Sequence, residues 1–154
     1  MVKTIVTQHL EECEIPFRIL QQNAPASSIE DAARLRGISP SIMVKSMLLR
    51  DMGNNYALAC CFGDQQIDPK KVRHRLQWRR MTCVSGQDVE IITGYQLGSV
   101  CPIKLKTPLP IIFDRNIILK DEVSISSGSN LAGIALATRD LIQLINPLFD
   151  DITR

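Results

Sequence analysis

Hydrophobic and polar residues alternate along this chain with two periods, one typical of strands and one typical of helices. The most informative segment runs from Ile42 to Arg50, where apolar residues surround one lysine, Lys45. The run indicates a buried strand, and because alternate side chains of a strand share a face, Lys45 lies between Met43 and Met47. An ammonium group on such a face must find a partner or reach the edge of the sheet, which makes Lys45 a candidate for chemistry. The alternative is a lysine whose stem covers the sheet while its head reaches solvent.

The first half of the chain predicts two helices and three strands. Ser27 or Ser28, followed by acidic residues, can cap a helix that Gly37 ends. Around the strand of Lys45, the turn at 51–55 leads into a returning strand, so the two form a hairpin. The expected elements are helices at 2–13 and 29–36 and strands at 15–20, 42–50 and 56–62.

The second half predicts further short elements around a long irregular segment. A helix opens at Asp68-Pro69, and Ser85 is expected to cap another. Glycines and prolines punctuate residues 94–110, which indicates a structured loop. The remaining expected elements are strands at 81–84, 111–114 and 122–126, helices at 85–93 and 138–146, and a turn at 127–130. Strands interleaved with helices but joined by hairpins indicate an α+β domain with a mixed sheet.

Length and composition favour one domain over residues 1–154. The chain has 154 residues, of which 45% are hydrophobic and 22% are charged, so it can bury a core without metals or disulfides. Five cysteines without paired spacing, and a start that lacks the apolar region of a signal peptide, favour a reducing cytoplasm. No segment has the apolar length of a spanning helix, so membrane insertion is not expected.

Positive charge is concentrated in one short segment although the formal net charge is only +2. Val72 and Leu76 can anchor one face of a short helix and leave the cations to point outward, with Trp78 as a possible stacking surface. Such a patch can contact phosphates, or it can be an ordinary solvated helix face. The cations of the segment are Lys70, Lys71, Arg73, His74, Arg75, Arg79 and Arg80.

Metal and nucleophile motifs are absent from the sequence. Cys60 and Cys61 are adjacent on a strand and point to opposite faces, and no ligand spacing typical of zinc occurs, so neither a metal nor another cofactor is expected. His9 and His74 fall on expected helices, far from any serine elbow. Cys101 is the one thiol that merits a test as a nucleophile, although packing is its more ordinary role.

The order of several short motifs resembles the YbaK and prolyl-tRNA synthetase-associated (ProX-like) editing domains, over about residues 15 to 150. Each motif is weak alone, and their order and spacing carry the resemblance. The motifs are Ser28-Ile29-Glu30-Asp31-Ala32-Ala33, Gly37, Val44-Lys45-Ser46, Thr93-Gly94-Tyr95, Gly98-Ser99-Val100-Cys101-Pro102 and Ser127-Gly128.

The resemblance implies a free-standing aminoacyl-tRNA deacylase on a curved mixed, mainly antiparallel β-sheet with flanking helices. Lys45 matches the family's key active-site lysine, and the Gly98–Pro102 loop matches the one that lines its pocket. The implied substrate-binding residues are Ser46, Gly98, Ser99, Val100, Cys101, Pro102, Gly128 and Ser129. The basic helix residues Lys70, Lys71, Arg73, Arg75, Arg79 and Arg80 are the expected tRNA contacts, and prolyl-tRNA synthetase is a further expected partner.

The resemblance leaves the substrate and the class of activity open. Some family members carry a histidine in the turn that matches Ser127 to Asn130, and its absence here favours clearance of Cys-tRNA(Pro) over Ala-tRNA(Pro). Two alternatives compete with this interpretation: a non-catalytic tRNA-binding or synthetase-associated module, and a small-molecule ester hydrolase that uses the same cleft.

Overall fold

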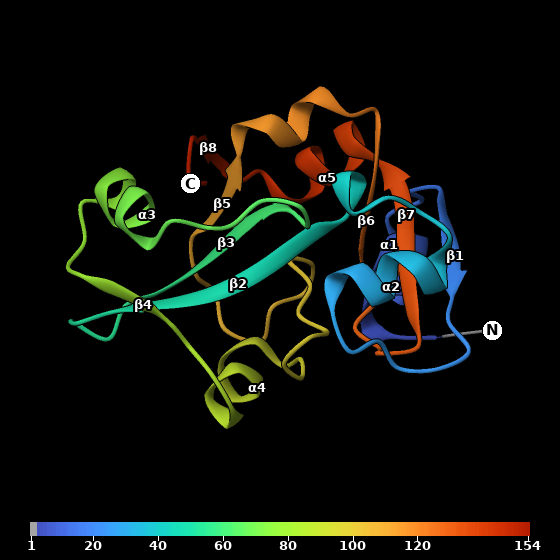
Figure 1. Ribbon diagram of the computed structural model, residues 1–154, viewed down its shortest axis with the longest axis horizontal. Helices are drawn as coiled ribbons and strands as arrows, with labels where there is room; N and C mark the ends of the chain where they lie inside the picture. Colours follow the sequence, from blue (N-terminus) through green and yellow to red (C-terminus); the bar gives the residue numbers. More distant parts are fainter. Residues whose placement is uncertain (1–2) are drawn as a thin grey trace.

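The computed structural model describes residues 3–154 as five α-helices and eight strands, with short 3-10 helices at Pro40–Ile42 and Arg115–Leu119 (Figure 1). The α-helices are α1 (Ile5–Glu12), α2 (Ile29–Arg36), α3 (Pro69–Leu76), α4 (Gln87–Thr93) and α5 (Thr138–Ile145). The strands are β1 (Phe17–Gln21), β2 (Val44–Asp51), β3 (Tyr56–Phe62), β4 (Met81–Cys83), β5 (Ile111–Asp114), β6 (Glu122–Ser126), β7 (Ala132–Ala137) and β8 (Leu148–Asp150).

The strands form two sheets, which confirms the expected α+β class with mainly antiparallel pairing. One sheet is antiparallel with the order β1-β7-β6. The other has the order β4-β2-β3-β5-β8 and is mixed, because β5 is parallel to both β3 and β8. The expected hairpin is present, with Lys45 opposite Cys61. The division into two sheets, rather than one, creates the junction at which the candidate site lies.

Local signals place the ends of most helices. The Ser28 hydroxyl accepts a hydrogen bond of 3.0 Å from the N–H of Asp31, and Gly37 ends α2 in the left-handed conformation at φ 70°. Asp68 caps α3 in the same way, with Pro69 at its first position. The prediction that Ser85 caps α4 is wrong. Gly86 occupies the N-cap position of this helix, and no side-chain capping hydrogen bond is formed there.

Strand β7 is a central element that the sequence analysis does not predict. Its residues, Ala-Gly-Ile-Ala-Leu-Ala, are mostly small and have low strand propensity. They are extended because β1 and β6 pair with both edges of the strand. Strand β8 and the 3-10 helix at Arg115–Leu119 are also outside the expected elements.

No helix among the described residues has the length and apolarity needed to cross a bilayer.

Strand β2 is the place where the two sheets meet. An isolated bridge joins Met43 to Ser124 of β6, and β4 pairs with the same edge of β2 only from Leu49 onward. Helices α3 and α4 cover opposite faces of this sheet, because Val72 packs with Leu49 whereas Val89 packs with Leu48. Between β6 and β4, one edge of β2 therefore has no partner strand in residues 3–154.

Candidate active site

The unpaired edge of β2 opens into a cavity of about 300 Å³. Residues from six places line it: the segment between β1 and α2, one face of α2, Met43 with the first part of β2, Val84 and Val89 before and within α4, the loop at Gly98, and the turn between β6 and β7. No aspartate or glutamate of the described chain is among the lining residues, whereas Lys45 and Arg36 both are. The cavity therefore carries positive charge without a compensating acid, which suits a ligand with anionic or electron-rich oxygen atoms.

Lys45 is half-buried and lines this cavity, as the strand pattern predicts. It forms no ion pair with any carboxylate of residues 3–154. Its strand neighbours Met43 and Leu49 are buried, so the stem of the lysine lies along apolar surface. The ammonium group is thus held beside the cavity without a protein partner, and it can contact a bound ligand.

The main chain of Ser46 offers a second polar group to the cavity. The C=O of Leu48 points away from β3 and accepts a hydrogen bond of 2.9 Å from the N–H of Val84. The C=O of Met43 points toward β3 and accepts a hydrogen bond of 2.7 Å from the N–H of Gly63, the residue that follows β3. Because every second residue of a strand turns its main-chain groups to the same edge, Ser46 directs its N–H and C=O toward the open edge. This N–H is a donor that a substrate carbonyl can reach.

The loop that follows α4 is fixed by several side-chain hydrogen bonds. Thr93 and Tyr95 are buried, and the Tyr95 hydroxyl donates to the C=O of Ile103 across the loop. Gly98 has a φ of +90°, a conformation that side chains with a Cβ rarely adopt. The Ser126 hydroxyl donates to the C=O of Ser99 at 2.7 Å and accepts from the N–H of Gly128 at 3.0 Å. A single hydroxyl therefore joins this loop to the β6–β7 turn.

The structure brings five of the nine pocket residues expected from the resemblance to the cavity wall, namely Lys45, Ser46, Gly98, Val100 and Ser129. The other four lie behind it. Ser99 is buried and contributes its C=O to the Ser126 bond. Cys101 is 0% exposed, and Pro102 is buried beside it, so neither lines the cavity. Gly128 supports the turn, since a Cβ there would stand 3.0 Å from Cε1 of Tyr95.

Thiols and imidazoles of the described chain do not supply a nucleophile at this site. Burial raises the pKa of the Cys101 thiol to about 12. Burial raises the pKa of Cys61 to about 12 as well, and the nearby positive charge of Lys45 opposes this only in part. His9 lies beside Cys13 on α1, and His74 lies on α3, so neither lines the cavity. The site can position a reactant and stabilise charge, but it lacks an activated protein nucleophile.

Arg36 and Gln22 are among the lining residues that were outside the sequence prediction. Ser28, Ala32 and Arg36 are four residues apart, so they lie on the one face of α2 that turns toward the cavity. In the sequence, Arg36 has the ordinary position of a cation in the last turn of a helix. The four-residue spacing was the one signal that could have indicated it.

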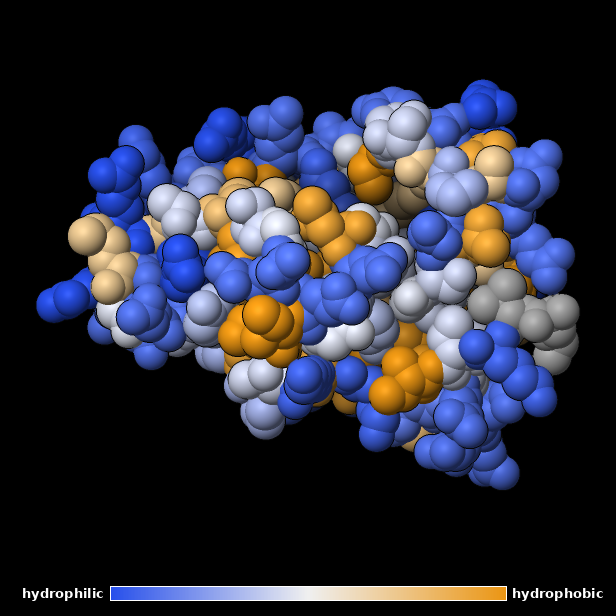
Figure 2. Space-filling view, turned by 90° about the horizontal axis from the view of Figure 1, so that it is seen from below, coloured by the Kyte–Doolittle hydropathy of each residue, from blue (hydrophilic) through white to orange (hydrophobic). Residues whose placement is uncertain are grey.

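Two exposed apolar residues lie near the cavity. Figure 2 shows the molecule from below the view of Figure 1, and on that face apolar residues form separate spots among hydrophilic ones. Leu97, next to Gly98 and part of the cavity lining, is 65% exposed, and Ile91 of α4 is 58% exposed. Leu97 thus offers an apolar contact at the rim, which a base or an apolar side chain of a ligand could cover.

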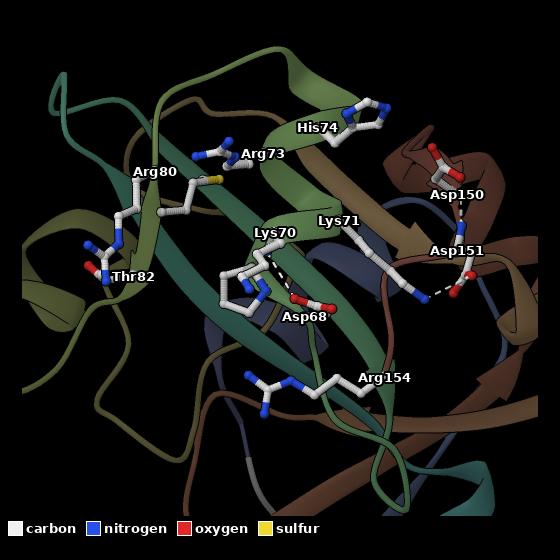
Figure 3. Close-up of a pocket in the computed structure, with 12 residues that line it drawn as sticks. Asp68, Lys70, Lys71, Arg73, His74, Arg80, Thr82, Asp150, Asp151 and Arg154 are labelled. Atoms are coloured by element: carbon white, nitrogen blue, oxygen red, sulfur yellow. Dashed lines mark hydrogen bonds and ion pairs between the residues drawn. The ribbon is translucent and has the colours of Figure 1, made fainter.

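The expected basic helix borders a second hollow, a groove of about 790 Å³ between α3, β4 and the end of the chain (Figure 3). The cations Lys70, Lys71, Arg73, His74 and Arg80 line it, and so does Arg154, which the sequence analysis does not mention. Three carboxylates, Asp68, Asp150 and Asp151, line it as well, so the cations are in excess but not alone. Figure 1 shows that α3 lies at the opposite end of β2 from α2. The groove and the cavity are therefore separate hollows that can contact different parts of a long ligand.

Two of the expected basic residues are occupied by ion pairs. Nζ of Lys71 lies 3.0 Å from Oδ2 of Asp151 and donates to the C=O of Thr153 at 2.6 Å, as Figure 3 shows for the carboxylate. Nε of Arg75 lies 3.4 Å from Oδ2 of Asp150. The two ion pairs hold Asp150 and Asp151 against α3. Trp78 is half-buried against the core, so only part of its side chain is open for stacking.

The fold and site together define an α+β domain in which a lysine and an open strand edge face one small cavity, with a groove lined by several cations some way from it. Residues 23–144 match the model of the aminoacyl-tRNA editing domain family. The match covers most of the chain, and the protein belongs to the aminoacyl-tRNA editing domain family, a family of aminoacyl-tRNA deacylases. The resemblance expected from the sequence motifs is confirmed.

Individual relatives agree with this assignment. The proline–tRNA ligase of Bacillus licheniformis is 33% identical over 103 residues, which are 67% of this chain and 18% of the ligase. A protein of Enterococcus faecalis, EbsC, described as a candidate Cys-tRNA(Pro)/Cys-tRNA(Cys) deacylase, is 24% identical over 98% of this chain and 93% of its own. A solved structure described as a candidate trans-editing enzyme for prolyl tRNA synthetase has a TM-score of 0.80 at 21% identity, covering 90% of this chain and 87% of that one, and supports the fold.

Proposed function

We propose that the protein hydrolyses the ester of a mischarged tRNA in trans, with Cys-tRNA(Pro) as the preferred substrate and Ala-tRNA(Pro) as the second candidate. The observation that carries the proposal is Lys45, an unpaired lysine beside a small cavity that no carboxylate of residues 3–154 lines. Prolyl-tRNA synthetase is the proposed partner, and the cytoplasm is the proposed location. No metal or other cofactor is assigned a role.

The proposed chemistry is ester hydrolysis by positioning. The oxygen of water bonds to the ester carbonyl carbon, the bond from that carbon to the ribose oxygen breaks, and the ribose oxygen leaves with a proton. Lys45 holds the substrate and stabilises the negative charge that develops on the carbonyl oxygen. The N–H of Ser46 at the open edge of β2 is the additional donor that we assign to that oxygen.

Amides of the loop at Gly98 are the other candidate donors. Ser99 is excluded from this role, because its N–H already donates to the C=O of Gln96 at 2.9 Å. Gly98 and Val100 both line the cavity, and the absence of a Cβ at Gly98 lets a ligand approach its main chain. The amides of Gly98 and Val100 are therefore the two in this loop that we assign as donors to the carbonyl oxygen.

The raised pKa values of the buried thiols support water, or a group of the substrate itself, as the nucleophile. The buried Cys101 thiol stays protonated near neutral pH, because its pKa is raised to about 12, and it does not line the cavity. A cysteinyl ester brings its own thiol into the cavity. A small cavity of about 300 Å³ is also consistent with a small aminoacyl group.

The basic groove is the proposed contact for tRNA phosphates away from the reacting end. Lys70, Arg73, Arg80 and Arg154 are the cations assigned to it, and Arg79 lies on the adjoining segment. Such contacts add affinity that falls with salt and does not depend on the amino acid. Lys71 and Arg75 are given a smaller part because they are engaged in ion pairs.

Incubation of the protein with tRNA charged with cysteine, alanine, serine or proline, followed by measurement of ester loss, tests the proposal. The expected result is hydrolysis of cysteinyl-tRNA(Pro) well above the spontaneous rate, with prolyl-tRNA(Pro) spared. A non-catalytic module would bind tRNA and hydrolyse none of the four. A small-molecule hydrolase would cleave free aminoacyl esters equally well and would be indifferent to mutation of Arg79 and Arg80.

A further inference from the structure

Arg36 is a half-buried cation at the cavity that the deacylation mechanism does not use. It ends α2 and lines the cavity together with Gln22, Ser126 and Ser129. Desolvation by burial lowers the pKa of its guanidinium from the ordinary value, although the group stays charged at neutral pH. No carboxylate of residues 3–154 forms an ion pair with it.

The guanidinium is held in one place by two neighbours. Its Nε donates a hydrogen bond of 2.7 Å to Oε1 of Gln22, a residue that is only 8% exposed and that donates in turn to the C=O of Ala24. Its flat face lies over the main chain of Gly133 in β7, where an added Cβ would stand 2.6 Å from Cζ. Because Gly133 has no side chain, the strand leaves room for the guanidinium.

A guanidinium has five N–H donors in a planar fork that matches the two oxygens of a carboxylate or phosphate. Only the Nε donor of Arg36 has a hydrogen-bond acceptor among the described residues. A partly buried charge without a counter-ion is costly, and two buried residues, Gln22 and Gly133, orient this one. An arrangement of this kind is useful when a ligand supplies the missing oxygens.

We propose that Arg36, oriented by Gln22 and Gly133, is an oxyanion subsite of the cavity that binds a carboxylate or phosphate group of the charged 3′ end of tRNA. The subsite rests on the proposed function and adds to it a determinant of which ends are accepted. Two groups of the substrate share the required chemistry. One is the phosphate on the 5′ side of the terminal adenosine, and the other is the side-chain carboxylate of an acidic amino acid.

The phosphate source is tested by equilibrium binding of adenosine 5′-monophosphate and of adenosine, which differ only in the phosphate. The wild-type protein is expected to bind the monophosphate about tenfold to a hundredfold more tightly, as a charge-assisted bidentate contact implies. Arg36→Met is expected to lose that preference. Arg34→Met is the matched control, because Arg34 lies on the same helix, is 72% exposed and pairs with Asp31 away from the cavity.

The carboxylate source is tested by deacylation of tRNA charged with aspartate and with asparagine, which have the same shape and differ in charge. If Arg36 reads the side chain, wild-type protein favours the aspartyl ester and Arg36→Met removes the preference. Gly133→Ala provides a second variant with the arginine retained, because its Cβ would displace the guanidinium. In the assay whose ratio Arg36→Met changes, nucleotide binding or deacylation, Gly133→Ala is expected to change the ratio in the same way.

The proposal is overturned if both ratios, monophosphate to adenosine and aspartyl to asparaginyl, are the same in wild type, Arg36→Met and Gly133→Ala. A merely structural arginine would give that result even if Arg36→Met lowered the melting temperature. The binding arm requires no turnover. A protein that hydrolysed no charged tRNA would therefore refute the proposed function, while the nucleotide ratios would still decide the role of Arg36.

Discussion

The hydroxyl of Ser126 in β6 donates a hydrogen bond of 2.7 Å to the main-chain oxygen of Ser99 in the loop after α4. The same hydroxyl accepts from the N–H of Gly128 in the β6–β7 turn at 3.0 Å. Gly98 and Ser129, the cavity residues next to these two contacts, are thus held relative to each other by one side chain. The relationship explains how irregular segments far apart in the sequence can form a defined wall.

Ser126→Ala is expected to loosen that wall. Loss of the hydroxyl leaves Ser99 O and Gly128 N without this partner and should cost about 1 kcal/mol of unfolding free energy. Turnover of cysteinyl-tRNA should fall, because the Gly98 and Val100 amides lose their support. Urea unfolding and single-turnover deacylation measure the two effects. Ser124→Ala in the same strand is the control, since the buried Ser124 hydroxyl has no hydrogen-bond partner within residues 3–154 and its removal should leave both quantities almost unchanged.

Gly128→Ala and Gly37→Ala should separate backbone strain from contact with Tyr95. Both glycines have positive φ, so an alanine at either position costs on the order of 1 kcal/mol. At Gly128 the added Cβ also stands 3.0 Å from the Tyr95 ring, whereas nothing lies within 4 Å at Gly37. Thermal unfolding should show the larger loss for Gly128→Ala. Equal losses would mean that the turn accommodates the ring without cost.

Lys70→Gln and Lys71→Gln form a pair that tests the basic groove. Lys70 is exposed and has no ion-pair partner in residues 3–154, whereas Lys71 is paired with Asp151. Lys70→Gln should weaken tRNA binding and lower the slope of log affinity against log salt by about one. Lys71→Gln should change that slope much less. Filter binding at several salt concentrations measures it, and equal slopes for the two variants would remove the groove from the tRNA interface.

Buried thiols should make the protein less stable in alkali. Burial raises the pKa of Cys60, Cys61 and Cys101 from 9.0 to about 12. Above pH 9 the unfolded chain releases these protons while the folded chain keeps them, so the full stability below pH 9 is lost progressively as the pH rises toward 12. The loss is on the order of 1 kcal/mol per thiol for each pH unit.

Urea unfolding between pH 8 and pH 10.5 checks this expectation. Cys101→Ala should unfold with a shallower dependence on pH than the wild-type protein, whatever its absolute stability. Cys83→Ala is the control, because Cys83 is exposed on β4 and its removal takes no buried thiol from the folded protein. A pH dependence that Cys101→Ala leaves untouched would show that its thiol ionises in the folded protein.

Most of the fold follows from local patterns, and the failures have physical causes. The hairpin with Lys45 could be predicted because its strands are long and apolar, and α2 because Ser28 and Gly37 are strong end signals. Strand β7 could not, because its alanines and Gly133 become extended only by pairing with β1 and β6. Local propensity contains no information about such pairing.

The residues of the candidate site, too, could be predicted from the sequence only in part. Lys45 was conspicuous because its neighbours are apolar, and Gly98 because glycines and prolines surround it. Cys101 is next to the cavity loop in sequence but points into the core, since the direction of a side chain on an irregular loop depends on tertiary contacts. Arg36 was not predicted as a site residue, because a cation in the last turn of a helix is common and the sequence does not reveal how far its side chain is buried.

The most direct test of the account is the rate at which Lys45→Met hydrolyses cysteinyl-tRNA(Pro) under single-turnover conditions. If Lys45 stabilises the reacting ester, the rate should fall by at least about a hundredfold while thermal unfolding remains close to wild type. Lys70→Gln, measured in parallel at saturating protein, should retain the wild-type rate. A Lys45→Met protein that is folded and hydrolyses the ester at nearly the wild-type rate would contradict the central claim.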